Sequence, residues 1–364
     1  MVVAPDPAGA LARLDRPLSG DSAAIAVPDG TRDVDVPAAL GALVPLLAGF
    51  SRVTVVVGLG LHRPLREPEL APLRGACPWP VVNHDPDATV ALGRVAQVPC
   101  EVHPAFVGVD QVITVGRVEL HQYAGLSGGH KGVAVGCGGR ATLAALHRRA
   151  LVCDPRVVVG RLVDNPFRAA VDALGRRIGC SLALQALPDG RWLAGHPDAV
   201  LDRAAAALQP WWRVPAPVAT CLLRVPAAKA ANLYQASRAA TYLALSPRPP
   251  LLPGARLVLD APCPEGVGRG SGELAFAALL ARTAPPWTGL LTDPVPSGAG
   301  LQRAFMLARL AQHYALLVAG CERPQELRAL GLQATSSSAE EVAGPHALEV
   351  LAPFSRLPQL APPA

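Results

Sequence analysis

Lysine is almost absent from this 364-residue chain, although basic residues are not. Of the 33 lysine and arginine residues, only Lys131 and Lys229 are lysines. Aromatic residues make up only 4% of the chain, and the arginines are scattered rather than grouped into a basic block with interleaved aromatic side chains. Because such blocks are the usual mark of nucleic-acid binding, we expect no nucleic-acid partner in spite of the net charge of +5.

The sequence also lacks a long apolar run and paired cysteines. The longest apolar stretch, residues 38–50, contains a proline and is too short to span a bilayer. Residues 1–20 carry acids and prolines where a secretory signal needs a continuous apolar segment. The eight cysteines form no CxxC pair, which argues against a zinc ribbon, and a chain this long does not need a disulfide scaffold. We therefore predict a cytoplasmic protein with reduced thiols and no membrane partner.

What the sequence does contain is an alternation of strand-like and helix-like segments. Runs of β-branched residues that lead into glycine predict strands at residues 51–64, 105–120 and 154–163. Helical patterns lie between and around them, at residues 38–50, 140–150 and 165–179. This alternation predicts an α/β domain with a parallel-rich sheet, in which ligands bind at the carboxyl ends of the strands.

A second α/β domain is expected in the other half of the chain. The proline-broken segment 208–220 indicates the boundary. Beyond it, the patterns predict one strand and three helices, at residues 255–262, 228–245, 272–284 and 301–312. We predict an N-terminal domain of residues 1–212, completed by residues 346–364, and a C-terminal domain of residues 213–345. The active site is expected in the cleft between the two domains.

Six of the nine histidines fall between residues 62 and 147. His62 and His121 each follow a predicted strand, so we expect both at one edge of the sheet, whereas His147 is expected on a helix. The other three, His84, His103 and His130, fit turns or loops. The role of His84 stays open. A single histidine is more often a hydrogen-bonded structural residue than a catalyst, so the two strand ends carry more weight than the count.

The segment "GLSGGHKG", residues 125–132, contains one of the two lysines. Its glycines could let backbone N–H groups approach an anion, or could form a tight turn, and neither the Walker spacing nor GxGxxG is present. Arginine would serve for binding phosphate, but only an amine readily forms a covalent bond. Lys131 is thus a candidate for covalent chemistry. The alternative is that it is a chance survivor of the arginine bias, as Lys229 would be.

Three motifs resemble those of one family. "GRVELHQYAGLSGGHKG" (116–132) is similar to the E-x-H-x-x-A-G-x-S-G-G-x-K signature of the nickel-dependent lactate racemases. "GLHRP" (60–64) resembles their G-x-H-R motif, and "PDGTRDV" (28–34) their D-x-T-R-P motif. The resemblance is strong over residues 25–150 and weaker over residues 233–238 and 260–273.

The resemblance implies a covalently bound cofactor. In that family it is a nickel pincer nucleotide, the nickel(II) complex of pyridinium-3-thioamide-5-thiocarboxylic acid mononucleotide. By motif position, Lys131 would form the covalent tether and His147 would be the protein ligand of nickel. The remaining positions expected to contact the cofactor are Asp29, Thr31, Ser127, Gly128 and Gly129. Cofactor biosynthesis proteins are then implied as partners.

The resemblance also implies an isomerase, a racemase or epimerase of lactate or a related short 2-hydroxy acid. His62 and His121 match the two acid–base histidines, one for each enantiomer. The nicotinamide-derived ring would accept and return the hydride, so no external NAD is consumed. The positions expected to bind the substrate are Arg32, Tyr234, Gln235 and Arg238. Arg238 stands where lactate racemases have lysine, so the substrate need not be lactate.

Other departures and alternatives bear on this interpretation. Asp33 replaces the proline of T-R-P, His130 replaces the usual arginine, and residues 330–342 lack the aromatic that lactate racemases contribute there. One alternative is a relative that carries the nucleotide without racemising anything; the presence of both His62 and His121 argues against it. Another is a metal hydrolase built from the histidines at 62, 84, 121 and 147, which the absence of an HExxH spacing disfavours.

Overall fold

The computed structural model describes residues 3–292, 294–296, 298 and 300–361. The chain forms two compact units, and neither is continuous in sequence. The first unit comprises residues 1–119, 126–146 and 166–208. The second comprises residues 120–125, 147–165 and 209–364. Segment 346–361 therefore belongs to the second unit, where the sequence placed it with the N-terminal domain.

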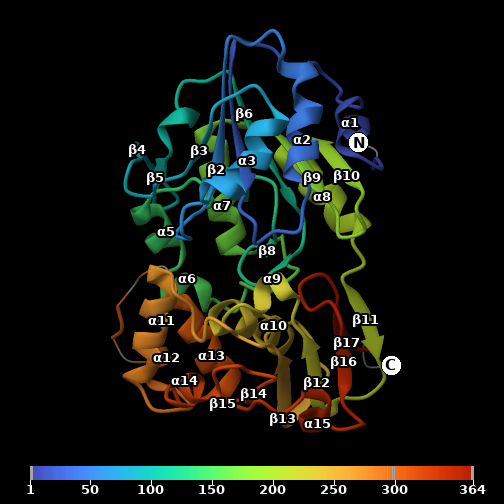
Figure 1. Cartoon of the computed structure of the whole chain (residues 1–364), viewed down its shortest axis with the longest axis vertical. Coiled ribbons are helices and arrows are strands. Elements are labelled where there is room, and N and C mark those ends of the chain that lie inside the picture. Colours follow the sequence, from blue (N-terminus) through green and yellow to red (C-terminus); the bar gives the residue numbers. More distant parts are fainter. Residues whose placement is uncertain (1–2, 293, 297, 299, 362–364) are drawn as a thin grey trace. The chain divides into compact units, whose positions relative to one another are not determined.

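The first unit is built on a six-stranded sheet with strand order β10-β9-β6-β1-β2-β3 (Figure 1). All neighbouring strands in it are parallel except β10, which runs antiparallel to β9. The strands are β1 Ser22–Pro28, β2 Arg52–Gly58, β3 Val81–Asn83, β6 Gln111–Arg117, β9 Cys180–Ala186 and β10 Trp192–Gly195. A separate antiparallel hairpin consists of β4 Val90–Val95 and β5 Val98–Val102.

Helices cover both faces of this sheet. Residues 22–27 of β1 are all buried, as expected for a central parallel strand with a helix layer on each side. On one face, Leu40, Leu43 and Leu70 from α2 and α3 pack against Ile25 and Val55. The helical segments of this unit are α1 Pro7–Leu11, α2 Val36–Leu43, η1 Pro45–Leu47, α3 Glu67–Ala76, η2 Pro104–Phe106, α4 Lys131–Ala134, α5 Arg140–Leu146, α7 Pro166–Ile178 and α8 Pro197–Ala207.

The second unit has a five-stranded, fully parallel sheet in the order β15-β14-β13-β12-β16. Its strands are β12 Val218–Arg224, β13 Leu251–Asp260, β14 Ala315–Ala319, β15 Gln333–Ala334 and β16 Leu348–Val350. Its helices are α6 Arg149–Val152, α9 Ala227–Ala230, α10 Leu233–Ala244, α11 Ser271–Ala281, α12 Gly289–Thr292, α13 Gln302–Ala311, α14 Pro324–Arg328 and α15 Ala339–Ala343. Two further strands, β11 Trp211–Val214 and β17 Leu357–Leu360, pair with each other, and the short strands β7 Leu120–His121 and β8 Gly125–Leu126 complete the set.

The predicted fold class, α/β with parallel-rich sheets, is confirmed, but several predicted elements differ. Residues 154–163 form turns rather than a strand, with Gly160 and Asp164 in the left-handed region. The predicted helix 140–150 is interrupted at residues 147–148, because Arg148 adopts an extended ψ of 141°. The predicted helix 228–245 is likewise divided before Asn232, which is extended and caps the second half by accepting from the Gln235 N–H.

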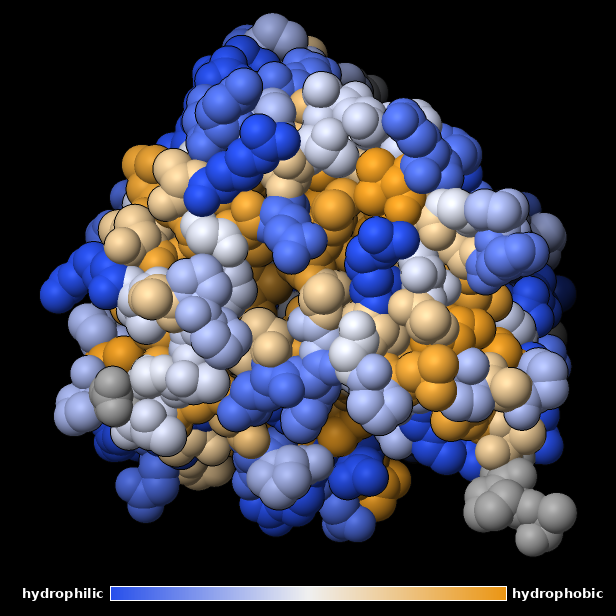
Figure 2. Space-filling view, turned by 90° about the horizontal axis from the view of Figure 1, so that it is seen from below, coloured by the Kyte–Doolittle hydropathy of each residue, from blue (hydrophilic) through white to orange (hydrophobic). Residues whose placement is uncertain are grey.

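The surface gives no sign of a membrane span. Among the described residues, no helix is both long enough and apolar enough to cross a bilayer. Figure 2, a view from below, shows polar and apolar side chains interspersed, with apolar residues gathered around a hollow near the centre of that face. In the second unit an apolar groove is lined by side chains that include Trp287, Leu310 and Leu332.

Candidate functional site

The carboxyl ends of neighbouring parallel strands bring together several of the predicted residues in the first unit. Asp29 directly follows β1, His62 lies in the loop after β2, and His84 follows β3. Glu119 comes two residues after the end of β6. Because β1, β2, β3 and β6 run parallel, these four side chains start from one edge of the sheet, where α/β proteins bind ligands.

His62 and Asp29 form the closest acid–base contact at this edge. Nδ1 of His62 lies 2.6 Å from Oδ2 of Asp29. Burial opposes ionisation of Asp29, but hydrogen bonds from His62 and Thr31 and the charge of Arg32 outweigh it, so the pKa of this carboxyl falls to about 2. The carboxylate is therefore ionised at neutral pH and accepts the Nδ1–H of His62. That hydrogen bond leaves the Nε2 lone pair of the exposed ring available to accept a proton.

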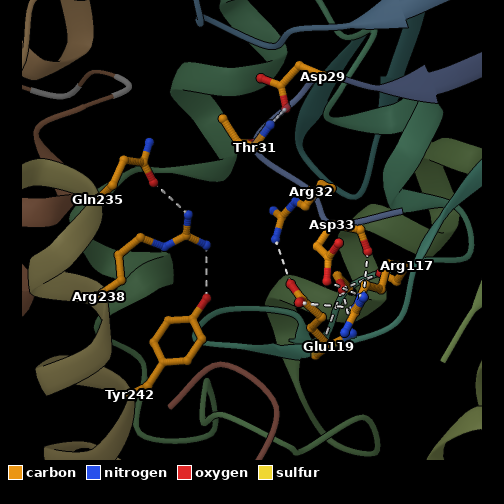
Figure 3. A network of polar contacts seen from close by, with 10 residues as sticks. Asp29, Thr31, Arg32, Asp33, Arg117, Glu119, Gln235, Arg238 and Tyr242 are labelled. Carbon is orange, nitrogen blue, oxygen red and sulfur yellow. Dashed lines mark hydrogen bonds and ion pairs between the residues drawn. The ribbon is translucent and has the colours of Figure 1, made fainter. Parts of the chain in front are cut away.

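The loop after β1 is tied to the same carboxylate (Figure 3). Oδ1 of Asp29 accepts hydrogen bonds from the backbone N–H and the hydroxyl of Thr31, at 3.2 and 2.6 Å. Nη1 of Arg32 lies 3.3 Å from Oε2 of Glu119, a buried carboxylate that also lies 3.4 Å from Nε of Arg117. Arg32 thus already has an acidic partner within the first unit, which weakens its predicted role as the main ligand of a substrate carboxylate.

The glycine loop has a conformation that its sequence requires. Gly128 and Gly129 have φ values of 91° and 60°, in the region that favours glycine. A Cβ on Gly128 would lie only 2.8 Å from Oε1 of Gln185. The hydroxyl of Ser127 is used within the loop, donating to the Arg117 carbonyl and accepting from the Glu119 N–H, each at 2.8 Å. Ser127 therefore orders the loop, and its predicted contact with a cofactor stays a prediction.

Lys131 begins α4 directly after this loop and is half-buried. The segment that follows α4 contacts the loop of His62. The Gly60 N–H donates to the Gly136 carbonyl at 2.8 Å. A Cβ on Gly58 would lie 3.1 Å from the Cα of Gly136, so both positions need glycine for the two segments to meet. The first unit thus holds the lysine loop and the histidine loop against each other.

His130, next to the lysine, is fully buried beside two carboxylates. His130, Asp172 and Asp198 place their ligand atoms within 4.8 Å of one another, close enough to hold a metal ion. Each carboxylate is already paired with an arginine, Asp172 with Arg168 and Asp198 with Arg176. Because two guanidinium groups beside a cation are unfavourable, this arrangement favours a structural ion-pair cluster rather than the nickel site.

His84, whose role the sequence left open, is a structural residue. Its side chain is buried, and its Nε2 donates to the Gly138 carbonyl at 3.0 Å, which fastens the end of β3 to the turn after α4. Burial lowers the pKa of His84 from its usual value of 6.5, and burial likewise lowers the pKa of its neighbour His103. Both rings thus favour the neutral form in the folded protein.

These shifts predict acid sensitivity of the fold. Below about pH 6.5 the unfolded chain binds protons at these positions more readily than the folded chain, so stability should fall as the pH is lowered from 8 to 5. Each unit of pKa depression costs about 1.4 kcal/mol. The substitution His84→Gln keeps a donor for Gly138 but cannot titrate, so its urea midpoint should fall less between pH 8 and pH 5. The exposed His346→Gln serves as the control, and an equal fall in both variants would assign the acid sensitivity to other groups.

Two of the predicted histidines belong to the second unit. His121 lies in β7, four residues beyond the end of β6, in a segment that belongs to the second unit. Its buried ring accepts hydrogen bonds at Nδ1 from the N–H groups of Tyr123 and Ala124, at 3.3 and 3.0 Å. The neutral ring therefore carries its proton on Nε2, the opposite tautomer to His62. His147 lies just after α5, not on a helix as predicted, and its ring packs edge-on against Tyr123 with centroids 5.9 Å apart.

Three of the four predicted substrate-binding residues lie on α10 of the second unit, and the fourth, Arg32, lies in the first unit. Arg238 donates from Nη1 to Oε1 of Gln235 at 3.0 Å and from Nη2 to the hydroxyl of Tyr242 at 2.9 Å (Figure 3). The hydroxyl of Tyr234 accepts from the Gln302 amide at 3.2 Å, and burial raises its pKa. Tyr234, Gln235 and Arg238 are thus brought together by one helix.

Sequence reasoning missed two charged residues here. Glu119 lies inside the E-x-H motif, and its position two residues before His121 was an available signal. Arg303 in α13 is buried among polar side chains of this unit, and nothing in the pattern of residues 301–312 marks it.

The fold and the site together define an α/β protein whose sheet edge presents a histidine–carboxylate pair beside a loop that contains glycines and a lysine. Comparison with known proteins agrees with the family resemblance of the motifs. Residues 8–160 match the lactate racemase N-terminal domain family. The resemblance of this part of the chain to the lactate racemases is thereby confirmed.

The similarity to individual proteins is more distant. Over 126 residues the chain is 28% identical to a lactate racemase from Lactiplantibacillus plantarum, a match that spans 33% of this chain and 30% of that protein. The lactate racemase apoprotein from Thermoanaerobacterium thermosaccharolyticum has the same fold, with a TM-score of 0.80, 17% identity, and coverage of 98% of this chain and 94% of that one. A Thermotoga maritima protein of known crystal structure matches with a TM-score of 0.73 at 13% identity, covering 98% of this chain and 96% of that one.

Proposed function

We propose that this chain is a racemase or epimerase of a short 2-hydroxy acid, lactate or a relative of it, with a nickel pincer nucleotide attached to Lys131. The observation that carries the proposal is the His62–Asp29 pair beside the loop of Lys131, within the region that matches the lactate racemase N-terminal domain family. Such a reaction needs a base that removes the substrate hydroxyl proton, and this pair is arranged to supply one.

The residues present fit the proposed cofactor. Lys131 offers a primary amine, which can be acylated, and His147 offers an imidazole nitrogen, a ligand type that suits nickel. The loop after β1 borders open space, since a Cβ built on Gly30 would meet no atom within 4 Å. When bound, the nucleotide would supply the group that takes up and returns a hydride.

His62 is assigned the proton transfer for one enantiomer. With Nδ1–H held by Asp29, its Nε2 accepts the hydroxyl proton. The ionised Asp29 then stabilises the imidazolium that results, because the two opposite charges are in direct contact. Thr31 holds the carboxylate in the orientation that this contact needs.

His121 is assigned the other enantiomer, but it is less ready to act as a base. Its Nδ1 is occupied by two backbone N–H groups, so its Nε2 carries a proton and can donate to a substrate oxygen. To accept a proton at Nε2, the ring must first give up those two hydrogen bonds. We therefore expect the two half-reactions to have unequal rates.

Racemisation itself tests the proposal. The protein, purified after production together with cofactor biosynthesis proteins, should convert a pure enantiomer of at least one short 2-hydroxy acid into a racemic mixture without added NAD. Chiral chromatography of a panel of single enantiomers measures this. A protein that carries the nucleotide and its nickel but changes no member of the panel would support the alternative of a non-racemising cofactor carrier.

A further inference from the structure

Arg303 is a buried guanidinium that has no acidic partner among the residues that the structure describes. The residue is 3% exposed. Its Nη1 donates to Oγ1 of Thr241 at 3.1 Å and to Oε1 of Gln122 at 3.2 Å, and its Nη2 donates to the hydroxyl of Tyr123 at 3.3 Å. All three acceptors are neutral, so the positive charge is solvated by dipoles but not balanced.

Arg238, which is half-buried, also bonds only to neutral side chains. Its two hydrogen bonds go to the neutral side chains of Gln235 and Tyr242. Across the described part of the chain, no carboxylate forms an ion pair with either Arg238 or Arg303. Elsewhere in the second unit an arginine is surrounded by acids, since Arg224 pairs with Asp260, Glu340 and Glu349.

The local backbone adds to the positive potential. Arg303 is the second residue of α13 and therefore lies near a helix N-terminus, which also attracts anions. The Nε atoms of both arginines are buried and have no hydrogen-bond partner in the structure. Since unpaired buried charges are unfavourable, and a donor is left over on each guanidinium, the region is prepared for anionic groups that the chain itself does not supply.

The two arginines share one polar region. The Cζ atom of Arg303 lies 6.0 Å from the ring centres of both Tyr123 and Tyr234. Burial raises the pKa of each tyrosine, and the charges of Arg303 and Arg238 both oppose that rise. Arg303 also donates to Thr241, which lies three residues after Arg238 on α10, so the two guanidinium groups lie in the same part of the second unit.

We propose that the substrate is a 2-hydroxy dicarboxylic acid, whose second carboxylate binds Arg303 while Arg238 binds the carboxylate next to the hydroxyl-bearing carbon. This inference rests on the proposed function and specifies its substrate class. A monocarboxylate would balance only one of the two charges. Arg32 does not change this count, because Glu119 already neutralises it within the first unit.

Binding to the full-length, cofactor-loaded protein tests the inference without requiring turnover. The probes are malate, a four-carbon 2-hydroxy dicarboxylate; succinate, the same skeleton without the hydroxyl; and lactate, a monocarboxylate. Calorimetry should show malate binding at least tenfold more tightly than lactate, with succinate also ahead of lactate. Equal affinities for malate and lactate would overturn the proposal.

A pair of variants on one helix identifies the residue responsible. Arg303→Met should lower the affinity for malate at least tenfold, to about that for lactate, and leave the affinity for lactate unchanged. Arg309→Gln removes a half-buried guanidinium from the same α13 and should bind both acids as the unchanged protein does. An unaltered preference for malate in Arg303→Met would contradict the assignment. If Arg303→Met does not fold, the comparison of malate and lactate affinities in the unchanged protein tests the proposal by itself.

The outcomes separate this inference from the proposed function. Tight, Arg303-dependent binding of malate without racemisation of any 2-hydroxy acid would support the dicarboxylate site and contradict the racemase. Racemisation of lactate and malate with equal affinity would support the racemase and contradict the second carboxylate site.

Discussion

Replacement of His62 by alanine should slow racemisation about 10²–10⁴-fold, the usual contribution of an acid–base group. Both overall directions should slow, since racemisation passes through both histidines. The half-reactions should nevertheless separate: in a single turnover, one pure enantiomer should still yield 2-oxo acid while the other yields little. Acid quenching followed by quantification of the 2-oxo acid from each enantiomer measures this directly, and His121→Ala should show the reverse preference.

Two further variants connect the effect to the Asp29 contact. Asp29→Asn keeps the size of the side chain but removes the charge that orients and stabilises the His62 ring, so it should impair the same enantiomer as His62→Ala. The matched control is Asp33→Asn, since Asp33 is exposed and its partner is Arg117. Equal loss of 2-oxo acid from both enantiomers in His62→Ala would contradict the two-base mechanism for this protein.

The sequence predicted the first sheet best where local and long-range preferences agree. The β-branched runs in residues 51–64 and 105–120 contain β2 and β6, because a buried parallel strand needs that composition along its length. Residues 154–163 have the same composition but form turns. Val157 and Val159 are buried without a strand to pair with, and the left-handed conformations of Gly160 and Asp164 prevent an extended segment. Composition indicates burial there, and only the tertiary structure determines the conformation.

At the site, too, the sequence indicated residues but not the conformation or contacts that the tertiary structure gives them. Motif spacing predicted roles for Asp29, His62 and Lys131. The structure brings the segments of His62 and Lys131 together through Gly60 and Gly136, and Asp29 contacts His62 directly. Spacing could not predict the tautomer of His121, which depends on two backbone N–H groups in a turn. Motif spacing also could not find Arg303. Its importance comes from contacts with Thr241 and Gln122, which lie 62 and 181 positions away in the sequence.

Replacement of Lys131 by arginine should remove covalent cofactor attachment completely. Arginine keeps the positive charge and the helix-forming tendency at the start of α4, so the fold should persist. A guanidinium does not become acylated under ordinary conditions, so the tether cannot form. The chain supplies its own matched control in Lys229→Arg, which replaces the only other lysine, a buried one whose Nζ lies 4.2 Å from the ring centre of Phe354.

The most direct test of the central claim is the intact mass of the protein, with peptide mapping and metal analysis, after production together with cofactor biosynthesis proteins. The unchanged chain and Lys229→Arg should carry the added mass of the pincer nucleotide on the peptide that contains Lys131, together with nickel. Lys131→Arg should be folded and lack that added mass. No added mass on the unchanged chain, or an adduct that persists in Lys131→Arg, would contradict the account.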